Sequence, residues 1–315
     1  MQIPKLKTAA LVTATFLAAL PALAADSNNS QQQQQGSAVV TVLPKSEVPG
    51  GISQDALHLK IDGKNSTITG WTPLRGAASR VEMVVLIDNG ARQDLSLQYK
   101  EISKFIQVLP PDSAVAVAYM ENGRAVLAGP LTTDRTAVAR ELHIPMAGIP
   151  GVSASPYFCL SDLAKHWPSN DVNARREVVM LTDGVDYYNP RYDPNDPYVQ
   201  AAITDSVKNH LVVYSIYWRS TGRFDRTGYA NFTGQNLLSE VTAATGGENY
   251  WQGYGNPVSL EPYLSDINRR LDNQYELRFI TPINGKPQMA SLKLNIAAEA
   301  KVDAPQQVYV HPAAE

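Results

Sequence analysis

The sequence comprises 315 residues, of which 44% are hydrophobic and 18% are charged. This length and composition support a substantial buried core and exclude a chain that is disordered throughout. The formal net charge of −3 excludes the broad basic surface with which proteins grip nucleic acid or anionic lipid. The single cysteine excludes an internal disulfide and a metal site built from several cysteines.

Residues 1–24 have the pattern of a Sec-type signal peptide. Two lysines precede an apolar stretch, residues 9–20, that is too short for a comfortable membrane span. Small residues that end at Ala24 supply a cleavage site, which we expect before Ala25. The pattern predicts a protein exported through Sec to the periplasm or the exterior, with no membrane insertion after cleavage. An uncleaved anchor is the alternative interpretation.

Two segments precede the main part of the chain. Residues 25–37 are polar and contain five consecutive glutamines, which predicts a flexible, disordered linker. Residues 38–75 contain a β-rich run at Val39–Leu43 and an alternating run at Leu57–Ile61. A turn signal at Asp62 and a second alternating run follow. We therefore expect a small β-hairpin element in this region.

Residues 76–273 alternate buried strands with amphipathic helices. The near-continuous apolar run Val81–Ile87 is typical of a strand that is buried on both faces of a sheet. Further strands are expected at Ala114–Met120, Arg124–Leu131, Val178–Leu181 and Leu211–Tyr217. Helices are expected over residues 95–109, 135–142, 156–167, 198–208, 234–244 and 260–271. This alternation predicts an α/β fold with a mainly parallel, Rossmann-like sheet and helices on both faces.

Residues 274–315 depart from this alternation. Tyr275–Ile280 and Ser291–Ile296 alternate apolar and polar side chains around a turn at Asn284. We expect these C-terminal strands and the tail to pack with the N-terminal β element, so that both ends of the chain form one small β subdomain.

Ligands of a parallel sheet gather beyond the carboxyl ends of its strands. Asp88 and Gly90 follow the first core strand, and Thr182 and Asp183 end a later one. The segment 151–155 precedes a helix and adds hydroxyl groups. We therefore expect two carboxylates and several hydroxyls to meet at one edge of the sheet.

The order of these motifs resembles the von Willebrand factor A (VWA) fold, and more closely the bacterial von Willebrand factor A-related family of exported proteins. Within the core, the resemblance rests on Asp88, on Thr182–Gly184 and on Thr245–Gly247. Outside it, Ile61–Lys64 is similar to the leading hairpin of that family, and Gln274–Phe279 to its strand after the last helix. The resemblance implies a VWA-like fold and a non-catalytic binding protein of the recognition or adhesion type.

The resemblance also implies a metal-ion-dependent adhesion site. The family pattern is Asp-x-Ser-x-Ser in a first loop, a threonine in a second and an aspartate in a third. Asp88 and Asp183 match the two aspartates, and Ser155 stands in for the threonine. Gly90 and Arg92 occupy the places of the two serines, so the site is degenerate.

Three interpretations of the degenerate site stay open. In the first, Mg²⁺ binds through Asp88, Ser155, Asp183 and water, which supply the oxygen ligands that this ion prefers. In the second, which we favour, the guanidinium of Arg92 neutralises the two aspartates, and no metal or other cofactor binds. In the third, Arg92 points to solvent.

Aromatic residues and arginines crowd the loops that are expected at this edge. They are Tyr187, Tyr188, Tyr192, Tyr198, Trp218, Phe224, Tyr229, Phe232, Tyr250, Trp251, Tyr254, Arg191, Arg219, Arg223 and Arg226. Both kinds of residue are enriched at binding hot spots. We expect a recognition face for a protein or glycan partner that includes Tyr187, Tyr188 and Tyr192. The alternative is that these rings only pack the loops down.

The run Asp193–Pro197 offers oxygen ligands for calcium but lacks the glycine and the closing glutamate of an EF-hand loop. A turn that caps a helix at Tyr198 explains it better.

Two other classes of function are alternatives to recognition. A hydrolase would need a thiolate such as Cys159 with His143 or His166, but a lone cysteine on a helix usually faces the core. We therefore expect no enzyme. A structural or assembly factor of the envelope would instead use strand edges, at Val39–Leu43 and Ser291–Ile296, to pair with a partner.

Overall fold

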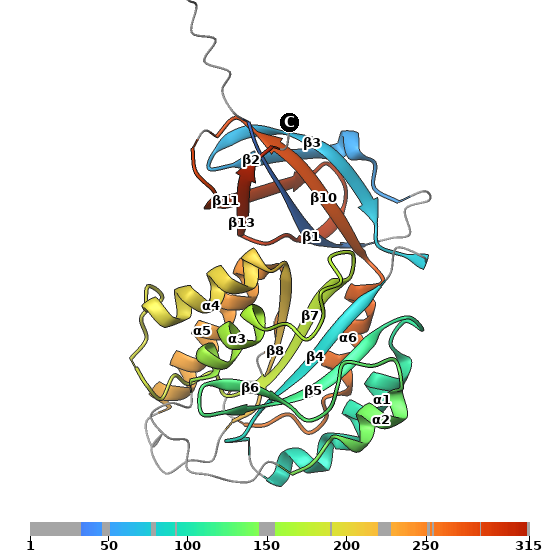
Figure 1. Ribbon diagram of the computed structural model, residues 1–315, viewed down its shortest axis with the longest axis vertical. Helices are drawn as coiled ribbons and strands as arrows, with labels where there is room; N and C mark the ends of the chain where they lie inside the picture. Colours follow the sequence, from blue (N-terminus) through green and yellow to red (C-terminus); the bar gives the residue numbers. More distant parts are fainter. Residues whose placement is uncertain are drawn as a thin grey trace, which may run out of the picture. The chain divides into compact units, whose positions relative to one another are not determined.

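The computed structural model describes residues 33–45, 51–76, 80–91, 93–144, 155–189, 191–219, 228–250, 253, 255–283 and 285–313. The expected signal peptide and most of the expected linker lie outside the described residues. The chain from residue 32 onward forms one compact unit that holds two separate sheets (Figure 1). None of the helices in the described ranges combines the length and the apolar character that crossing a bilayer requires.

One sheet has six strands in the order β6-β5-β4-β7-β8-β9. The strands are β4 (Val81–Asp88), β5 (Ala114–Glu121), β6 (Arg124–Leu127), β7 (Arg175–Thr182), β8 (Leu211–Tyr217) and β9 (Asn249–Tyr250). All neighbours pair in parallel except β5 and β6. The register of β4 with β7 places Ile87 beside Leu181, so both strands end at the same edge. The prediction of a mixed α/β fold is confirmed.

Helices cover both faces of this sheet (Figure 1). They are α1 (Tyr99–Val108), α2 (Arg135–Arg140), α3 (Pro156–Lys165), α4 (Pro197–Lys208), α5 (Tyr229–Thr245) and α6 (Glu261–Leu271); a short 3₁₀ helix, η3 (Gln93–Gln98), precedes α1. Alternate residues of a strand point to opposite faces. Val85 and Ile87 therefore join the core with α1, α2 and α6, whereas Val84 and Leu86 join the core with α3, α4 and α5.

Strand β6 corrects one detail of the predicted parallel sheet. It is short and runs antiparallel to β5, with Glu121 opposite Arg124. The two residues between them, Asn122 and Gly123, both have positive φ, at 49° and 75°. An Asn-Gly pair adopts this conformation readily and closes a two-residue hairpin, so the chain turns back at once instead of crossing over.

The second sheet is a closed antiparallel barrel, where the sequence predicted only a small β subdomain. Its strands are β1 (Gln34–Pro44), β2 (Leu57–Ile61), β3 (Lys64–Pro73), β10 (Gln274–Thr281), β11 (Gln288–Ile296), β12 (Ala300–Asp303) and β13 (Gln307–Pro312), with a 3₁₀ turn, η1 (Gln54–Ala56), before β2. The order is β10-β3-β2-β11-β13-β1-β12, and pairing of β10 with β1 closes the ring. The fold is therefore a mainly parallel α/β sheet with a closed antiparallel barrel, where the sequence predicted a Rossmann-like sheet with a small β subdomain.

Strand β1 begins inside the segment predicted to be a disordered linker. Gln34 pairs with Thr281 of β10, and its side chain Nε2 donates to the carbonyl of Gly285 at 2.7 Å. Gln34 is buried. The last glutamines of the polar tract are ordered because the barrel supplies backbone partners for them, and the linker boundary at residue 37 is corrected accordingly.

A buried arginine joins α6 to the strands around it. Arg270 has only 2% of its side chain exposed, and it donates to Asp266 at 2.7 Å, to Asp303 of β12 at 2.6 Å and to Glu248. Lys301 also contacts Glu248, at 2.6 Å. Because three carboxylates converge on one guanidinium, its removal would leave several charges without their buried partner.

Candidate functional site at the carboxyl edge of the parallel sheet

Asp88 ends β4 with both carboxylate oxygens engaged. Its Oδ1 accepts a hydrogen bond from the backbone N–H of Gly90 at 2.7 Å, and its Oδ2 accepts one from the Thr182 hydroxyl at 2.5 Å. Burial raises the pKa of Asp88, and these two bonds offset part of that effect. The Thr182 bond joins the ends of β4 and β7, as the parallel register requires.

Asp183, the next residue along β7, is also held by its own loop. Its Oδ1 accepts from the backbone N–H of Val185 at 2.9 Å, and its Oδ2 accepts from the Tyr187 hydroxyl at 3.0 Å. Asp183 is buried. The structure therefore brings Asp88 and the Thr182–Asp183 loop together at one edge, while Arg92 lies outside the described residues.

Two glycines let the loop after β7 lie against α5. Gly184 has a φ of +68°, and a Cβ built on it would lie 2.5 Å from a side-chain atom of Leu238. A Cβ on Gly234 would lie 2.1 Å from the carbonyl oxygen of Asp183. Both distances are too short for any side chain, so this close approach requires glycine on both elements.

Helix α3 is joined to the same loop from the other side. Ser155 is its N-cap and accepts from the backbone N–H of Tyr157 at 3.3 Å. The Tyr157 hydroxyl donates to the carbonyl of Gly184 at 2.7 Å. The Ser155 side chain also bonds Asp186, and none of its described bonds goes to Asp88. Sequence reasoning placed Thr182 at this edge but did not predict that its hydroxyl would bond Asp88.

A second group of carboxylates lies one turn further along the loop. Asp186 accepts from the backbone N–H of Tyr188 at 2.9 Å. Asn189 donates from its side chain to Asp196 Oδ2 at 2.6 Å, and its backbone N–H bonds Asp186. Asp196 is the N-cap of α4, which confirms that the run Asp193–Pro197 caps this helix. Asp186 and Asp196 are both buried.

Aromatic rings surround this group. Phe158, Tyr188 and Tyr198 pack edge to face, with ring centroids 4.7–5.6 Å apart. Tyr188 is 47% exposed and Tyr192 is 40% exposed, and Tyr192 hydrogen-bonds Glu240 of α5. Tyr187, which bonds Asp183, is half-buried.

Other rings of the expected recognition face are divided between core and surface. Tyr229 and Phe232, at the start of α5, are exposed, whereas Trp218 is buried. Phe224, Trp251, Tyr254, Arg223 and Arg226 lie outside the described residues. Some of the rings pack the loops down and others face solvent.

Hydrogen bonds join the loops on the far side of the edge. Asn256 accepts from the backbone N–H of Arg219 at 2.5 Å and donates to Asp94 Oδ2 at 3.2 Å. These bonds connect the loops that follow β8, β9 and β4. The edge is thus a set of mutually braced loops.

The residues expected to bind Mg²⁺ offer it a poor ligand set. Each oxygen of Asp88 and of Asp183 already accepts a hydrogen bond, and Ser155 faces a different carboxylate. Gly90 contributes an N–H to Asp88 where the family pattern has a hydroxyl ligand. Within the described residues, no three His, Cys, Asp or Glu side chains are grouped to hold a metal ion.

The residues considered for a hydrolase, Cys159, His143 and His166, do not form a catalytic pair in the described part of the chain. Cys159 is buried on α3, and burial raises the pKa of its thiol. The ring of His166 contacts Asp162 at 3.1 Å, and the ring of His143 contacts the carbonyl of Glu141 at 3.0 Å. Neither imidazole has a described contact with the thiol.

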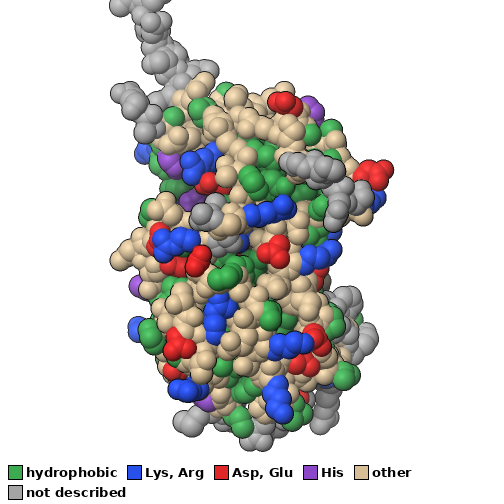
Figure 2. Space-filling model, turned by 90° about the vertical axis from the view of Figure 1, so that its right-hand side faces the viewer, with side chains coloured by type: hydrophobic (Ala, Val, Ile, Leu, Met, Phe, Trp, Pro, Cys, Tyr) green, Lys and Arg blue, Asp and Glu red, His purple; other side chains and the backbone are tan. Residues whose placement is uncertain are grey.

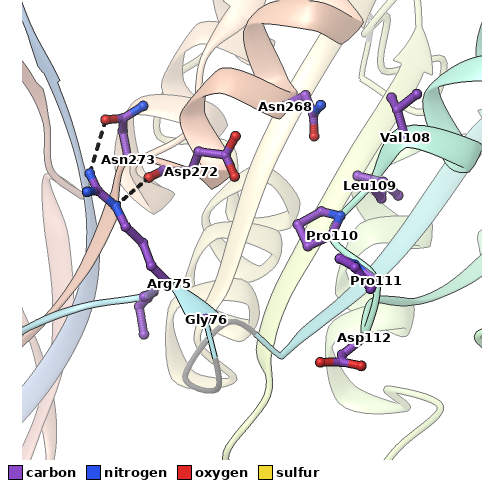
Figure 3. A pocket seen from close by; sticks show the side chains of 11 residues that line it. Arg75, Gly76, Val108, Leu109, Pro110, Pro111, Asp112, Asn268, Asp272 and Asn273 are labelled. Carbon is purple, nitrogen blue, oxygen red and sulfur yellow. Dashed lines mark hydrogen bonds between the residues drawn. The ribbon is translucent and has the colours of Figure 1, made fainter.

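A cleft of about 910 Å³ lies where α1 and α6 end. Figure 3 shows Arg75 reaching toward Asp272 and Asn273, with Pro110 and Asp112 on the facing wall. Arg75 donates to the carbonyl of Asp272 at 2.9 Å and to the side-chain oxygen of Asn273 at 3.4 Å. The bonds drawn in Figure 3 join Arg75 to the Asp272 carbonyl and to Asn273, and none of them involves Asp112 or Asn268.

Charge is mixed on the surface. Figure 2 shows Lys and Arg side chains interspersed with Asp and Glu on the face that it displays. Ion pairs such as Lys104–Glu261, at 2.6 Å, connect neighbouring charges of opposite sign. This distribution agrees with the small net charge.

Comparisons with known proteins give only distant similarities. No family model and no curated protein matches the chain. Among solved structures, the conserved hypothetical protein BatB from Bacteroides thetaiotaomicron is 16% identical, with a TM-score of 0.44, over 61% of this chain and 97% of that one.

Two further solved structures are similar over the same share of the chain. Proximal thread matrix protein 1 from the mussel byssus, with a zinc-occupied MIDAS motif, is 12% identical, with a TM-score of 0.43, over 62% of this chain and 46% of that one. The SpRpn10 VWA domain is 12% identical, with a TM-score of 0.36, over 59% of this chain and 94% of that one. Similarities this distant carry no argument about family or site.

Proposed function

We propose that the chain is an exported VWA-like binding protein that recognises a protein or glycan partner at the carboxyl edge of its parallel sheet and catalyses no reaction. The observation that carries the proposal is the exposure of Tyr188 and Tyr192 on the loop that begins with Thr182 and Asp183. Rigidly braced loops with exposed aromatic rings suit recognition, because little conformational entropy is lost when a partner binds.

Within this proposal, the adhesion site is degenerate. Asp88 and Asp183 have their oxygens engaged by N–H and O–H donors, and Gly90 removes one expected ligand. We propose that Arg92, two residues after Gly90, supplies the positive charge that these buried carboxylates need, in place of Mg²⁺.

A structural or assembly role through strand edges has less support. Val39–Thr41 pair with β10, and Thr41–Leu43 pair with β12, so β1 has neighbours along the segment considered for such pairing. Ring closure between β10 and β1 removes the open edge that this role would use.

The proposal is tested by quantitative capture from envelope extracts. The variants Tyr188→Ser and Tyr192→Ser remove exposed rings, and Arg92→Ala removes the expected charge. Val172→Ser is the matched control, because Val172 is 88% exposed but precedes β7 and so lies toward its amino end. We expect the edge variants to retain less than a tenth of the partner and the control to retain all of it. Equal capture by all four proteins would refute the proposal.

A further inference from the structure

An unexplained feature near the Asp88–Asp183 pair is the carboxylate of Asp186. The residue is 1% exposed, and its Oδ2 has no hydrogen-bond partner within the described residues. A buried polar atom without a partner is costly and is normally satisfied by protein, water or an ion. In contrast, the oxygens of Asp88 and Asp183 all have donors.

A second buried carboxylate lies close to Asp186. Asn189 contacts both groups, with its backbone N–H on Asp186 and its side-chain amide on Asp196 Oδ2 at 2.6 Å. No ion pair with a basic side chain is formed by either aspartate in the part of the chain that the structure describes. Two like charges therefore share a buried site without a described countercharge.

A proton alone does not resolve this arrangement. Burial raises the pKa of Asp186, and the charge of Asp196 raises it further. A proton on Oδ2 would neutralise Asp186 alone and would leave the charge of the buried Asp196 unbalanced. A cation at Oδ2 would instead satisfy the oxygen and balance both charges.

We propose that Asp186 holds a hard divalent cation through its Oδ2, with the charge of Asp196 beside it and Ca²⁺ as the first candidate, in a site separate from the degenerate adhesion site. The Ser155 hydroxyl bonds Asp186, and the Asn189 amide oxygen has no described partner, so both are available as further oxygen ligands. A carboxylate oxygen with hydroxyl, amide and water oxygens forms a ligand set that Ca²⁺ accepts in irregular geometry, and the nearby charge of Asp196 adds electrostatic attraction.

The cation would order the recognition face. Asp196 Oδ1 caps α4 by accepting from Tyr198, and Asp186 accepts from Tyr188. Tyr188 and Tyr198 are two of the three aromatic residues whose rings pack together beside the site. A bound ion would therefore fix the loop from residue 186 to residue 198 and the exposed rings that it carries.

The test measures bound metal and thermal stability on the full-length protein. After purification in Ca²⁺ and gel filtration, elemental analysis is expected to find one Ca²⁺ per chain in the wild type and less than a tenth of that in Asp186→Asn. Added Ca²⁺ is expected to raise the unfolding temperature of chelator-treated wild type by several degrees and to leave the variant unchanged.

Three controls keep the outcome decisive. Asn189→Ser removes a ligand without altering a buried carboxylate, and it is expected to weaken Ca²⁺ binding at least tenfold even where Asp186→Asn fails to fold. Asp193→Asn, at an exposed neighbouring aspartate, is expected to bind as wild type. The proposal is overturned when Ca²⁺, Mg²⁺ and Mn²⁺ neither bind nor stabilise the wild type. Binding that is lost in Asp88→Asn and kept in Asp186→Asn overturns it as well, by assigning the ion to the adhesion site.

Discussion

Glu177 lies in the middle of β7 with its side chain completely buried, near Arg175 and Gln274. Burial raises the pKa of Glu177 from its ordinary 4.5 to about 7, although Arg175 and Gln274 nearby offset part of the effect. We predict that Glu177→Gln, which keeps the shape and removes the charge, stabilises the protein at alkaline pH.

The sign and size follow from linkage. Below pH 4.5, Glu177 is protonated in both the folded and the unfolded state, so its burial carries no charge penalty. Because its pKa is higher in the folded state, the unfolding free energy falls as pH rises from 4.5 toward 7. A displacement from 4.5 to about 7 corresponds to about 3 kcal/mol of unfolding free energy. Above pH 7, we expect Glu177→Gln to recover up to this amount.

Urea denaturation at pH 4.5 and pH 8.5 measures the effect. We expect wild type and Glu177→Gln to be equally stable at the lower pH and to differ by about 2–3 kcal/mol at the higher one. Glu82→Gln is the control, because it removes another buried carboxylate, which accepts a hydrogen bond from Trp167 at 2.7 Å. This variant keeps Glu177, so we expect it to lose stability above pH 4.5 as the wild type does. The same loss in Glu177→Gln as in wild type would refute the reasoning.

Three further predictions concern packing and hydrogen bonds. Arg270→Ala is expected to lower the unfolding free energy by about 3–5 kcal/mol, because three carboxylates lose their buried partner; denaturant unfolding measures this, and a change below about 1 kcal/mol would contradict it. Gly234→Ala is expected to lower the unfolding free energy by about 1–3 kcal/mol and to reduce partner capture, because the added Cβ displaces the loop after β7. Gly255→Ala is the control, because a Cβ there has open space around it, and it is expected to leave stability and capture unchanged. Thr182→Val is expected to lower the unfolding free energy by about 2 kcal/mol, because Asp88 Oδ2 loses its hydrogen-bond donor. Thr182→Ser keeps the hydroxyl and is expected to retain most of the wild-type stability.

The parallel sheet was predictable because its signals are local. Runs such as Val81–Ile87 are apolar throughout, since these strands are buried on both faces, and helices of regular period separate them. Strands that run in parallel end at a common edge, so the meeting of Asp88 with the loop after Leu181 followed from topology alone.

The barrel was harder to predict because its closure joins distant segments. Strand β1 pairs with β10, and Gln34 lies opposite Thr281 although 247 residues separate them in the chain. No local pattern encodes such a pairing, and the strands Ala300–Asp303 and Gln307–Pro312, with four and six residues, are too short for their alternation to mark them. The reversal at β6 did have a local signal, the Asn-Gly pair after Glu121.

The details of the site depended on side-chain direction. Ser155 was expected beside Asp88, but its role as N-cap of α3 and its bond to Asp186 turn it elsewhere. Thr182 took the place beside Asp88 because the register of β4 and β7 sets the ends of these strands side by side. The spacing of these residues predicted the edge of the sheet on which they lie, but it did not predict which hydroxyl would hydrogen-bond which carboxylate.

Site-specific photo-crosslinking tests most directly whether recognition occurs at the carboxyl edge. A photoreactive amino acid replaces Tyr192 in one protein and Val172 in another, since both side chains are well exposed. Each is irradiated in envelope extract, and the adducts are resolved by mass. If the partner binds at the carboxyl edge, we expect a discrete adduct from position 192 and none from position 172. An adduct only from position 172, or equal adducts from both, would contradict it.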